Sequence, residues 1–204
     1  ESIEYVPLES DTNSAIQYIN DIIITEDRFI IQEHFSCKAF NIYGEYLCNY
    51  GSQGNGPGEF QLILKISIDE NTKKVYINCI QKLIFEFSIE GNFIRQITIP
   101  QEVYDHSPYQ FSVTALGNNC FCALVSNFNI SGNPYRLFLF NDSNQVTGKF
   151  PDYYNDPLLR KNEAMYFRIN NRDIVKGNRN IYTEGLNDTV FCLNSKNQLY
   201  PVYL

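Results

Sequence analysis

The sequence predicts an all-β fold of the propeller type, built from four consecutive copies of a four-stranded antiparallel unit. Three observations favour this fold. Phe and Tyr each occur 15 times in the 204 residues and Trp is absent, and aromatic and β-branched residues prefer strands. No segment carries a convincing apolar stripe of helical period. Short strands also recur about every 50 residues, and four antiparallel strands at that spacing are typical of a propeller blade.

The repeat is clearest in the second half of each unit. A large apolar residue recurs at intervals of 47, 53 and 53 residues: Phe40, Phe87, Phe140 and Leu193. Four positions after each of them stands a residue type that tolerates a left-handed backbone: Gly44, Gly91, Asn144 and Asn197. Two more apolar columns follow at alternating spacing, as one buried strand face requires. Each unit therefore ends in a strand, a tight turn and a second strand.

Two further strands precede this hairpin in every unit. The predicted first strands are residues 21–25, 64–68, 111–115 and 164–169. The predicted second strands are residues 29–31, 75–77, 120–124 and 180–183. We therefore expect one propeller domain over residues 1–204, with blades at about residues 20–50, 64–98, 111–150 and 164–204. A single helical turn is expected, at residues 156–163.

One predicted strand has no blade to complete. Residues 3–8 alternate apolar and polar side chains but precede the first blade. In a closed ring such a strand completes the last blade, yet the fourth blade already has an outer strand at residues 198–203. The surplus predicts a longer parent chain, or a second copy of the chain that covers the bare faces of the terminal blades. A closed ring of four blades is the alternative.

The segment between the first two blades, residues 51–60, reads Gly-Ser-Gln-Gly-Asn-Gly-Pro-Gly-Glu-Phe. Together with residues 66–69, 75–77 and 87–93 it resembles the NHL-type propeller repeat, and more closely the six-bladed β-propeller family common in Bacteroides and its relatives. Other segments that look like parts of this family are residues 5–9, 187–191 and 199–203. The resemblance implies a six-bladed ring and an exported protein of the cell envelope, periplasmic or associated with the outer membrane and often lipid-anchored. It implies no established activity.

Composition and motifs argue against several classes of function. The net charge is −7 and the basic residues form no run, so a nucleic acid bound through its phosphates is not expected. No apolar stretch is long enough to span a membrane. The glycines of residues 51–60 lack the Lys of a P-loop and the helix of a dinucleotide site, so they predict a connection between blades.

The six cysteines lie in or beside predicted strands, where we expect them to be small buried side chains. Cys120 and Cys122 are two residues apart on one strand face, about 7 Å from each other, so they should not be bonded to one another. One disulfide between other cysteines is the alternative if the protein is in an oxidising compartment.

The candidate binding surface lies in the loops. Connections between blades share one end of a propeller with the loops between second and third strands, and long insertions gathered there usually mark a binding face. These loops carry aromatic and polar residues that suit a glycan, a peptide or a protein ligand. The predicted binding residues are His34, Tyr104, Asp105, His106, Tyr109, Asn127, Phe128, Asn129, Tyr153, Tyr154, Asp156 and Arg160. The structural alternative is that the tyrosines only pack long loops onto the scaffold.

No catalytic constellation is found in the sequence. Only two histidines occur, and neither a Gly-x-Ser-x-Gly elbow nor a His-Glu-x-x-His motif is present. We therefore predict a non-catalytic binding scaffold without a cofactor, and leave open a calcium ion held by oxygen atoms. The alternatives are a propeller-type lyase or lactonase with a metal in the central channel, and a purely structural assembly module.

Overall fold

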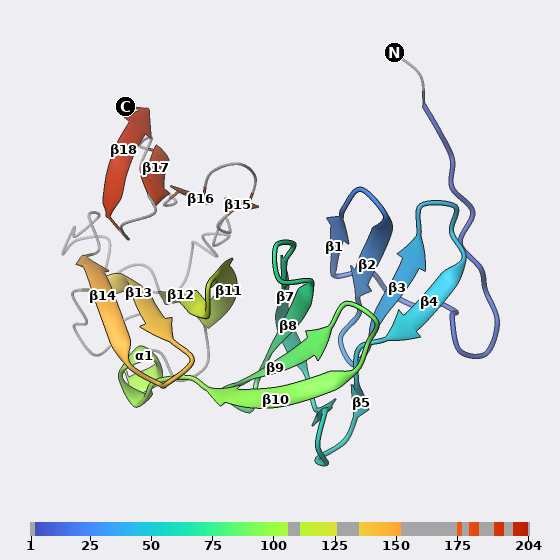
Figure 1. Cartoon of the computed structure of the whole chain (residues 1–204), viewed down its shortest axis with the longest axis horizontal. Coiled ribbons are helices and arrows are strands. Elements are labelled where there is room, and N and C mark those ends of the chain that lie inside the picture. Colours follow the sequence, from blue (N-terminus) through green and yellow to red (C-terminus); the bar gives the residue numbers. More distant parts are fainter. Residues whose placement is uncertain are drawn as a thin grey trace, which may run out of the picture. The chain divides into compact units, whose positions relative to one another are not determined.

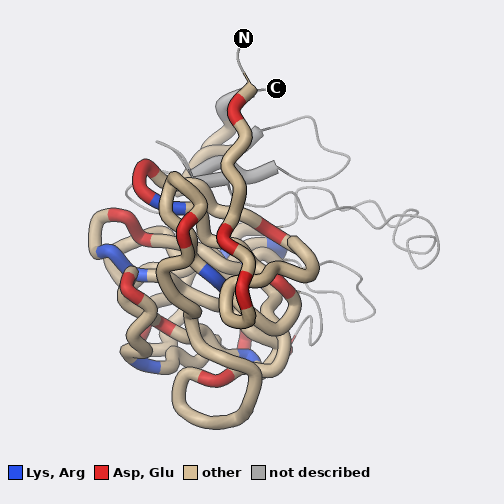
Figure 2. The backbone as a smooth tube through the Cα atoms, turned by 90° about the vertical axis from the view of Figure 1, so that its right-hand side faces the viewer, with Lys and Arg blue, Asp and Glu red and all other residues tan. Residues whose placement is uncertain are grey.

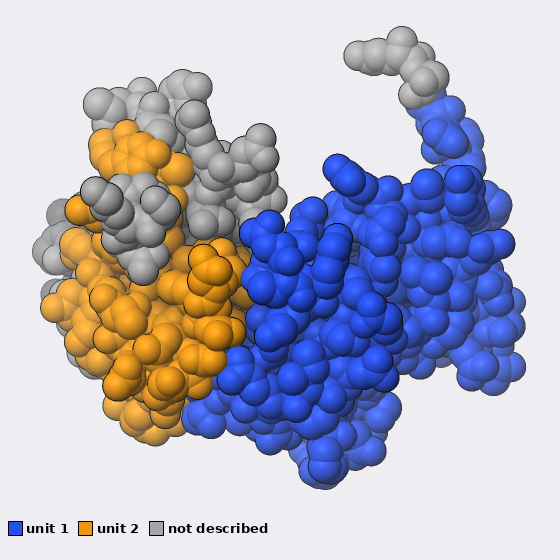
Figure 3. All heavy atoms as spheres, viewed as in Figure 1, with its two compact units in different colours: residues 1–98 blue, residues 99–204 orange. Residues whose placement is uncertain are grey.

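The computed structural model describes residues 3–105, 111–125, 135–151, 175–176, 180–183, 190–193 and 198–203 (Figure 1). These residues form four antiparallel sheets of four strands each, and strands that are consecutive in sequence are neighbours in each sheet. The chain divides into two compact units, Glu1–Thr98 (unit 1) and Ile99–Leu204 (unit 2), coloured separately in Figure 3. The prediction of an all-β fold made of four-stranded units is confirmed.

Unit 1 contains the first two sheets, which we call blade 1 and blade 2. Blade 1 consists of β1 (Asp21–Ile24), β2 (Arg28–Gln32), β3 (Cys37–Asn41) and β4 (Tyr46–Asn49). Blade 2 consists of β7 (Ile63–Asp69), β8 (Lys74–Cys79), β9 (Leu83–Ser88) and β10 (Phe93–Thr98). The connection between the blades holds a short parallel pair, β5 (Ser52–Gln53) and β6 (Glu59–Phe60).

Unit 2 contains a short helix and the other two sheets. The helix is α1 (Gln101–Asp105), which the sequence did not predict. Blade 3 consists of β11 (Phe111–Gly117), β12 (Cys120–Val125), β13 (Tyr135–Asn141) and β14 (Val146–Pro151). Blade 4 consists of β15 (Val175–Lys176), β16 (Asn180–Thr183), β17 (Val190–Leu193) and β18 (Leu199–Tyr203).

The first strand of blade 4 differs from the prediction. The strand that pairs with β16 is β15, with Val175 opposite Ile181. The segment predicted for this place, residues 164–169, lies outside the described residues, as does the helical turn expected at residues 156–163.

The four apolar column residues are all buried, as predicted. Phe40, Phe87, Phe140 and Leu193 are 0%, 1%, 0% and 7% exposed. The hairpin turns that follow them also fit the prediction. Gly44, Gly91 and Asn144 have φ angles of 87°, 91° and 63°, in the left-handed region that glycine and asparagine tolerate. The fourth turn residue, Asn197, lies outside the described residues.

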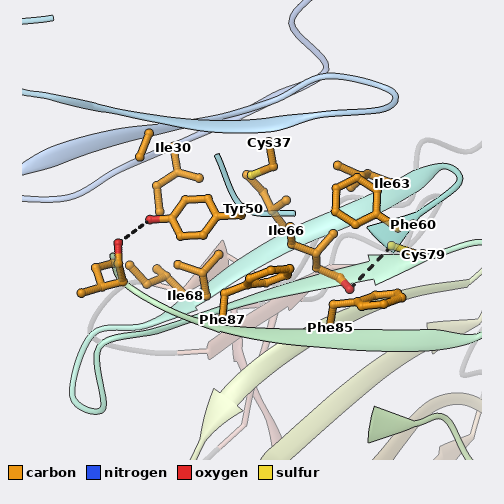
Figure 4. Close-up of a cluster of buried hydrophobic side chains, with 14 residues drawn as sticks. Ile30, Cys37, Tyr50, Phe60, Ile63, Ile66, Ile68, Cys79, Phe85 and Phe87 are labelled. Atoms are coloured by element: carbon orange, nitrogen blue, oxygen red, sulfur yellow. Dashed lines mark hydrogen bonds between the residues drawn. The ribbon is translucent and has the colours of Figure 1, made fainter. Parts of the chain in front are cut away.

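The core of unit 1 lies between blade 1 and blade 2 (Figure 4). Every second residue of a strand points to the same face, which brings Ile30 of β2 into one cluster with Ile66 of β7 and Phe87 of β9. Tyr50, which follows β4, is completely buried in this cluster, and its hydroxyl donates a hydrogen bond to the Ile89 carbonyl at 2.9 Å. Burial in these apolar surroundings raises the pKa of Tyr50.

The core of unit 2 has the same construction. Cys122 and Leu124 of β12 pack with Leu137 and Leu139 of β13 and, from blade 4, with Phe191 and Leu193 of β17. Blades 3 and 4 thus share an apolar interface as blades 1 and 2 do. This face-to-face packing of successive four-stranded sheets is the construction of a β-propeller.

The N-terminal segment differs from the prediction. Residues 3–8, for which a strand was predicted, contain no strand. The segment is instead attached to blade 1 by separate hydrogen bonds. Glu9 donates from its backbone N–H to the Gly44 carbonyl at 2.8 Å, and Lys38 of β3 donates to the Ala15 carbonyl. The backbone polar groups of the N-terminal segment therefore bond to a turn and to side chains of blade 1, and not to the backbone of a neighbouring strand.

The connection between blades 1 and 2 is built as the sequence predicted. Gly51 and Gly58 have positive φ angles of 72° and 75°. A Cβ atom on Gly51 would lie 2.4 Å from the Gly58 carbonyl oxygen and 2.7 Å from the Phe60 ring. The glycines thus let residues 51–60 fold back on themselves and place Phe60, which is completely buried, in the core of unit 1.

All six cysteines are free in the structure. The prediction that Cys120 and Cys122 are not bonded to each other is confirmed. Burial raises the pKa of Cys37 and of Cys122 well above the usual value for a thiol, and it does so less strongly for Cys48. Since the thiolate is the reactive form, the buried thiols are small core side chains of low reactivity.

Charges are dispersed along the described chain. Figure 2 shows acidic positions interspersed with fewer basic ones, in keeping with the net charge of −7. No helix among the described residues is long and apolar enough to cross a membrane.

Candidate functional site

The two ends of blade 1 carry different connections between strands. Because neighbouring strands are antiparallel, the β1–β2 and β3–β4 turns lie at one end of the blade. The β2–β3 loop and the connection toward β7 lie at the other, which we call the loop end (Figure 1). The backbone N–H of Ile63, at the start of β7, donates to the His34 carbonyl at 2.9 Å. The loop end of blade 1 is therefore tied to the first strand of blade 2.

Three of the twelve predicted site residues are described by the structure: His34 in unit 1, and Tyr104 and Asp105 in unit 2. The other nine lie outside the described residues: His106, Tyr109, Asn127, Phe128, Asn129, Tyr153, Tyr154, Asp156 and Arg160. Their place in a binding surface stays a prediction.

Tyr104 and Asp105 lie on α1, where the helix itself engages their polar groups. The Tyr104 hydroxyl donates to Gln101 Oε1, and Gln101 Nε2 donates to Asp105 Oδ1. A further link fixes the helix within unit 2, because Lys149 of β14 forms an ion pair with Glu102. These contacts favour the structural interpretation of this loop, in which aromatic and acidic residues hold a short connection in place.

His34 belongs to an exposed group of aromatic side chains, which we call the aromatic platform: Tyr18, His34 and Phe35. The His34 ring is stacked on the Tyr18 ring, with centroids 5.1 Å apart and planes 12° from parallel. The Phe35 ring lies 6.0 Å from His34 at a tilt of 55°. Tyr18 is 60% exposed and Phe35 50% exposed. Large rings that are ordered against one another and still face water form a surface suited to a flat apolar ligand face.

The β2–β3 loop explains why His34 and Phe35 project outward. The backbone N–H of Glu33 donates to the Ser36 carbonyl at 2.8 Å, which closes a tight turn. His34 and Phe35 are the two central residues of that turn. The strand residues on either side of the loop, Gln32 and Cys37, are buried. The turn places the two rings between them outside the core, at the loop end, where both are exposed.

Polar groups surround the aromatic platform. Asn20 Nδ2 lies 2.9 Å from His34 Nδ1, at hydrogen-bond distance. Asp21, the first residue of β1, pairs with Lys65 of β7 at 3.0 Å. Gln32, opposite Asp21 in the strand pair, donates weakly to the Ile63 carbonyl at 3.5 Å, and its buried Oε1 has no hydrogen-bond partner among the residues that the structure describes. Asn20 thus contacts the platform directly, and the Asp21–Lys65 pair lies at the start of the neighbouring strand β1.

No metal site is formed by the described part of the chain, in which no three His, Cys, Asp or Glu side chains come together. The expected lack of a cofactor, and the calcium ion that the sequence left open, both stay untested predictions. What the aromatic platform offers is stacking and hydrogen bonding, which are the means of binding rather than of bond cleavage.

Sequence reasoning found His34 but missed Tyr18, Asn20, Asp21 and Lys65. Tyr18 and Asn20 precede the first blade, in a stretch without periodicity. A usable signal does exist for Asp21 and Lys65. First strands line the centre of a propeller, and a charged residue at the start of such a strand interrupts an otherwise apolar pattern.

The chain matches a family model over residues 1–204, described as "Domain of unknown function (DUF4934)". The chain belongs to this family. Among curated proteins none matches the sequence.

Several solved structures share the fold of this DUF4934 chain. A protein of Bacteroides fragilis assigned as exported superposes with a TM-score of 0.76 at 14% identity, over 98% of this chain and 54% of that protein. A member of the DUF4221 family from Bacteroides vulgatus gives a TM-score of 0.57 at 8% identity, over 96% and 60% of the two chains. The WD40 repeats of RRP9 also give 0.57, at 13% identity, over 96% and 53%.

The DUF4934 chain thus spans little more than half the length of these propellers. Identities of this size show a shared fold alone. The β-propeller architecture, inferred from the repeat and seen in the face-to-face sheets, is therefore supported by the comparisons as well.

Proposed function

We propose that this DUF4934 propeller is a non-catalytic binding scaffold that takes a glycan at the loop end of its blades. The observation that carries the proposal is the aromatic platform. Tyr18 and His34 are stacked and remain exposed beside Phe35, with polar groups next to them. Sugar rings present apolar C–H faces that stack on aromatic rings, and hydroxyl groups that bond to amides and charged side chains.

The polar neighbours fit the same ligand class. Asn20 lies against His34, and the Asp21–Lys65 pair is partly exposed, with 35% and 17% of the two side chains accessible. Sugar hydroxyls both donate and accept, so a carboxylate and an ammonium group side by side can each be used. We propose that the predicted loop residues of unit 2 outside the described residues, from His106 to Arg160, carry aromatic and polar groups suited to the same ligand class.

The proposal includes an exported protein of the bacterial cell envelope, in the periplasm or at the outer membrane, held by a lipid anchor. Its support is the sequence resemblance to the Bacteroides propeller family and the fold shared with a Bacteroides fragilis protein assigned as exported. The bacterial cell envelope contains polysaccharides, which are the ligand class that we propose for the exposed aromatic rings.

A direct test is a glycan array probed with the purified chain, followed by calorimetry on any glycan bound. His34→Ala and Phe35→Ala should each weaken binding about tenfold, because each removes one stacking partner. Tyr43→Ala is the matched control: Tyr43 is 76% exposed at the β3–β4 turn, at the opposite end of the same blade, and its loss should leave the affinity unchanged.

The outcomes separate the candidates. Capture of peptides but no glycan would make the ligand class wrong, and a loss of binding with Tyr43→Ala alone would place the site at the other end of blade 1. Cleavage of a bound polysaccharide, or a metal that copurifies with the chain and is needed for binding, would favour the lyase or lactonase.

We also propose that blade 1 packs against a further blade, in a six-bladed ring of a longer chain or in a second copy. Ile22 and Ile24 of β1 point away from the core of unit 1 and are 43% and 70% exposed. Apolar side chains gathered on a sheet face tend to be covered by another surface. Light scattering on residues 1–204 should therefore show association that Ile24→Lys reduces, whereas a monomer at high concentration would contradict the proposal.

A further inference from the structure

Glu33 is a buried carboxylate at a place where glutamate is usually solvated. It follows β2 and begins the β2–β3 loop, and only 11% of its side chain is exposed. Two backbone N–H groups donate to Oε1: those of Gln17 at 2.8 Å and Tyr18 at 3.2 Å. The Ser36 hydroxyl donates to Oε2, and Lys38 Nζ lies 3.2 Å from the same oxygen. Both oxygens are therefore satisfied, as a buried charge requires.

These donors come from three different elements. Gln17 and Tyr18 belong to the N-terminal segment, Ser36 closes the β2–β3 loop, and Lys38 lies on β3. Lys38 also donates to the Ala15 carbonyl, so the ion pair attaches the segment at a second point. One carboxylate thus joins the N-terminal segment to the loop of the aromatic platform.

The charge state of Glu33 fits this role. Burial would raise its pKa, but the hydrogen bonds from Ser36, Gln17, Tyr18 and Lys38 act more strongly together and leave the pKa below its usual value. Glu33 is therefore ionised at neutral pH. An ionised oxygen accepts stronger hydrogen bonds than a neutral one, which favours the attachment of the segment.

We propose that Glu33 is the positioning residue of the aromatic platform. His34 directly follows Glu33 in the chain, and Tyr18 is bonded to its carboxylate through the backbone. The stacking of the two rings, with centroids 5.1 Å apart, is thus held by the hydrogen bond from the Tyr18 backbone N–H to Glu33, in which neither ring takes part. Without the carboxylate, the backbone N–H groups of Gln17 and Tyr18 lose their acceptor, and Tyr18 leaves His34.

The meaning of this inference for binding rests on the proposed function, but its test needs no ligand. The chain has no Trp, so Tyr18→Trp introduces a single indole that reports on the stacking. In this background, Glu33→Ala should raise the acrylamide quenching constant of the indole roughly twofold, because the ring face covered by His34 becomes accessible. Glu33→Gln keeps one acceptor oxygen but loses the ion pair with Lys38, and should give an intermediate value.

Glu26→Ala is the matched control, since Glu26 is an exposed glutamate in the β1–β2 turn of the same blade and should leave quenching unchanged. Circular dichroism shows whether each variant is folded; if Glu33→Ala is not, Glu33→Gln decides. Quenching that stays at the background value in folded Glu33 variants would overturn the proposal, even if glycan binding were found. A glycan screen without a hit would contradict the proposed function and leave the role of Glu33 standing.

Discussion

Replacing Phe87 with alanine is expected to lower the free energy of unfolding by about 3–5 kcal/mol. Phe87 is 1% exposed and lies in the cluster that joins blade 1 to blade 2. Its ring has edge contacts with Tyr50 and Phe93, with centroids 6.1 Å and 5.7 Å apart. The variant leaves a cavity at an interface between two sheets, where neither sheet can move in without losing its own packing.

Urea unfolding followed by circular dichroism measures this loss. Phe35→Ala is a suitable control, because it removes the same ring from a position that is 50% exposed, and it should change stability by no more than about 0.5 kcal/mol. If the two variants were equally stable, Phe87 would not belong to a closely packed core, and the repeat register on which the blade assignment rests would be wrong.

The fold could be predicted because the sequence signals for its strands and turns are local and recur in each blade. The apolar columns at Phe40, Phe87, Phe140 and Leu193 each report the same strand in a different blade, so an error in one is corrected by the others. The turn residues add backbone chemistry that few residue types allow. The N-terminal segment has no copy elsewhere in the chain, so its alternation alone predicts a strand, and the structure contains none there.

The candidate site was predictable only in part. Topology placed His34 on the side of the long loops, since the β2–β3 loop has its place in every blade. Its stacking partner Tyr18 comes from a stretch without periodicity, and their contact depends on how the segment folds over blade 1. Glu33 was passed over for a physical reason: a glutamate beside a loop is normally solvated, and its burial depends on donors that are distant in sequence, such as Gln17.

Replacing Gly51 with alanine is expected to destabilise the chain by about 2–5 kcal/mol, from two separate causes. Its φ of 72° lies in the left-handed region, which costs an L-residue about 1–2 kcal/mol. The added methyl group would also meet the Gly58 carbonyl oxygen at 2.4 Å, the Phe60 ring at 2.7 Å and the Phe87 ring at 3.0 Å. None of these can move easily, and overpacking of such a site costs about 1–3 kcal/mol.

Gly54→Ala, on the same connection, separates this effect from a general loss of glycine. Its added methyl group would meet the carboxylate of Glu59 at 2.1 Å, which is the end of a flexible side chain, and Gly54 is not among the positive-φ residues. Moving that carboxylate breaks its 2.8 Å hydrogen bond with the Gly56 N–H and should cost about 1 kcal/mol. Urea unfolding should therefore rank Gly51→Ala well below Gly54→Ala in stability. Equal midpoints would show that residues 51–60 do not fold back against the core through Gly51, and the connection would then hold Phe60 by some other means.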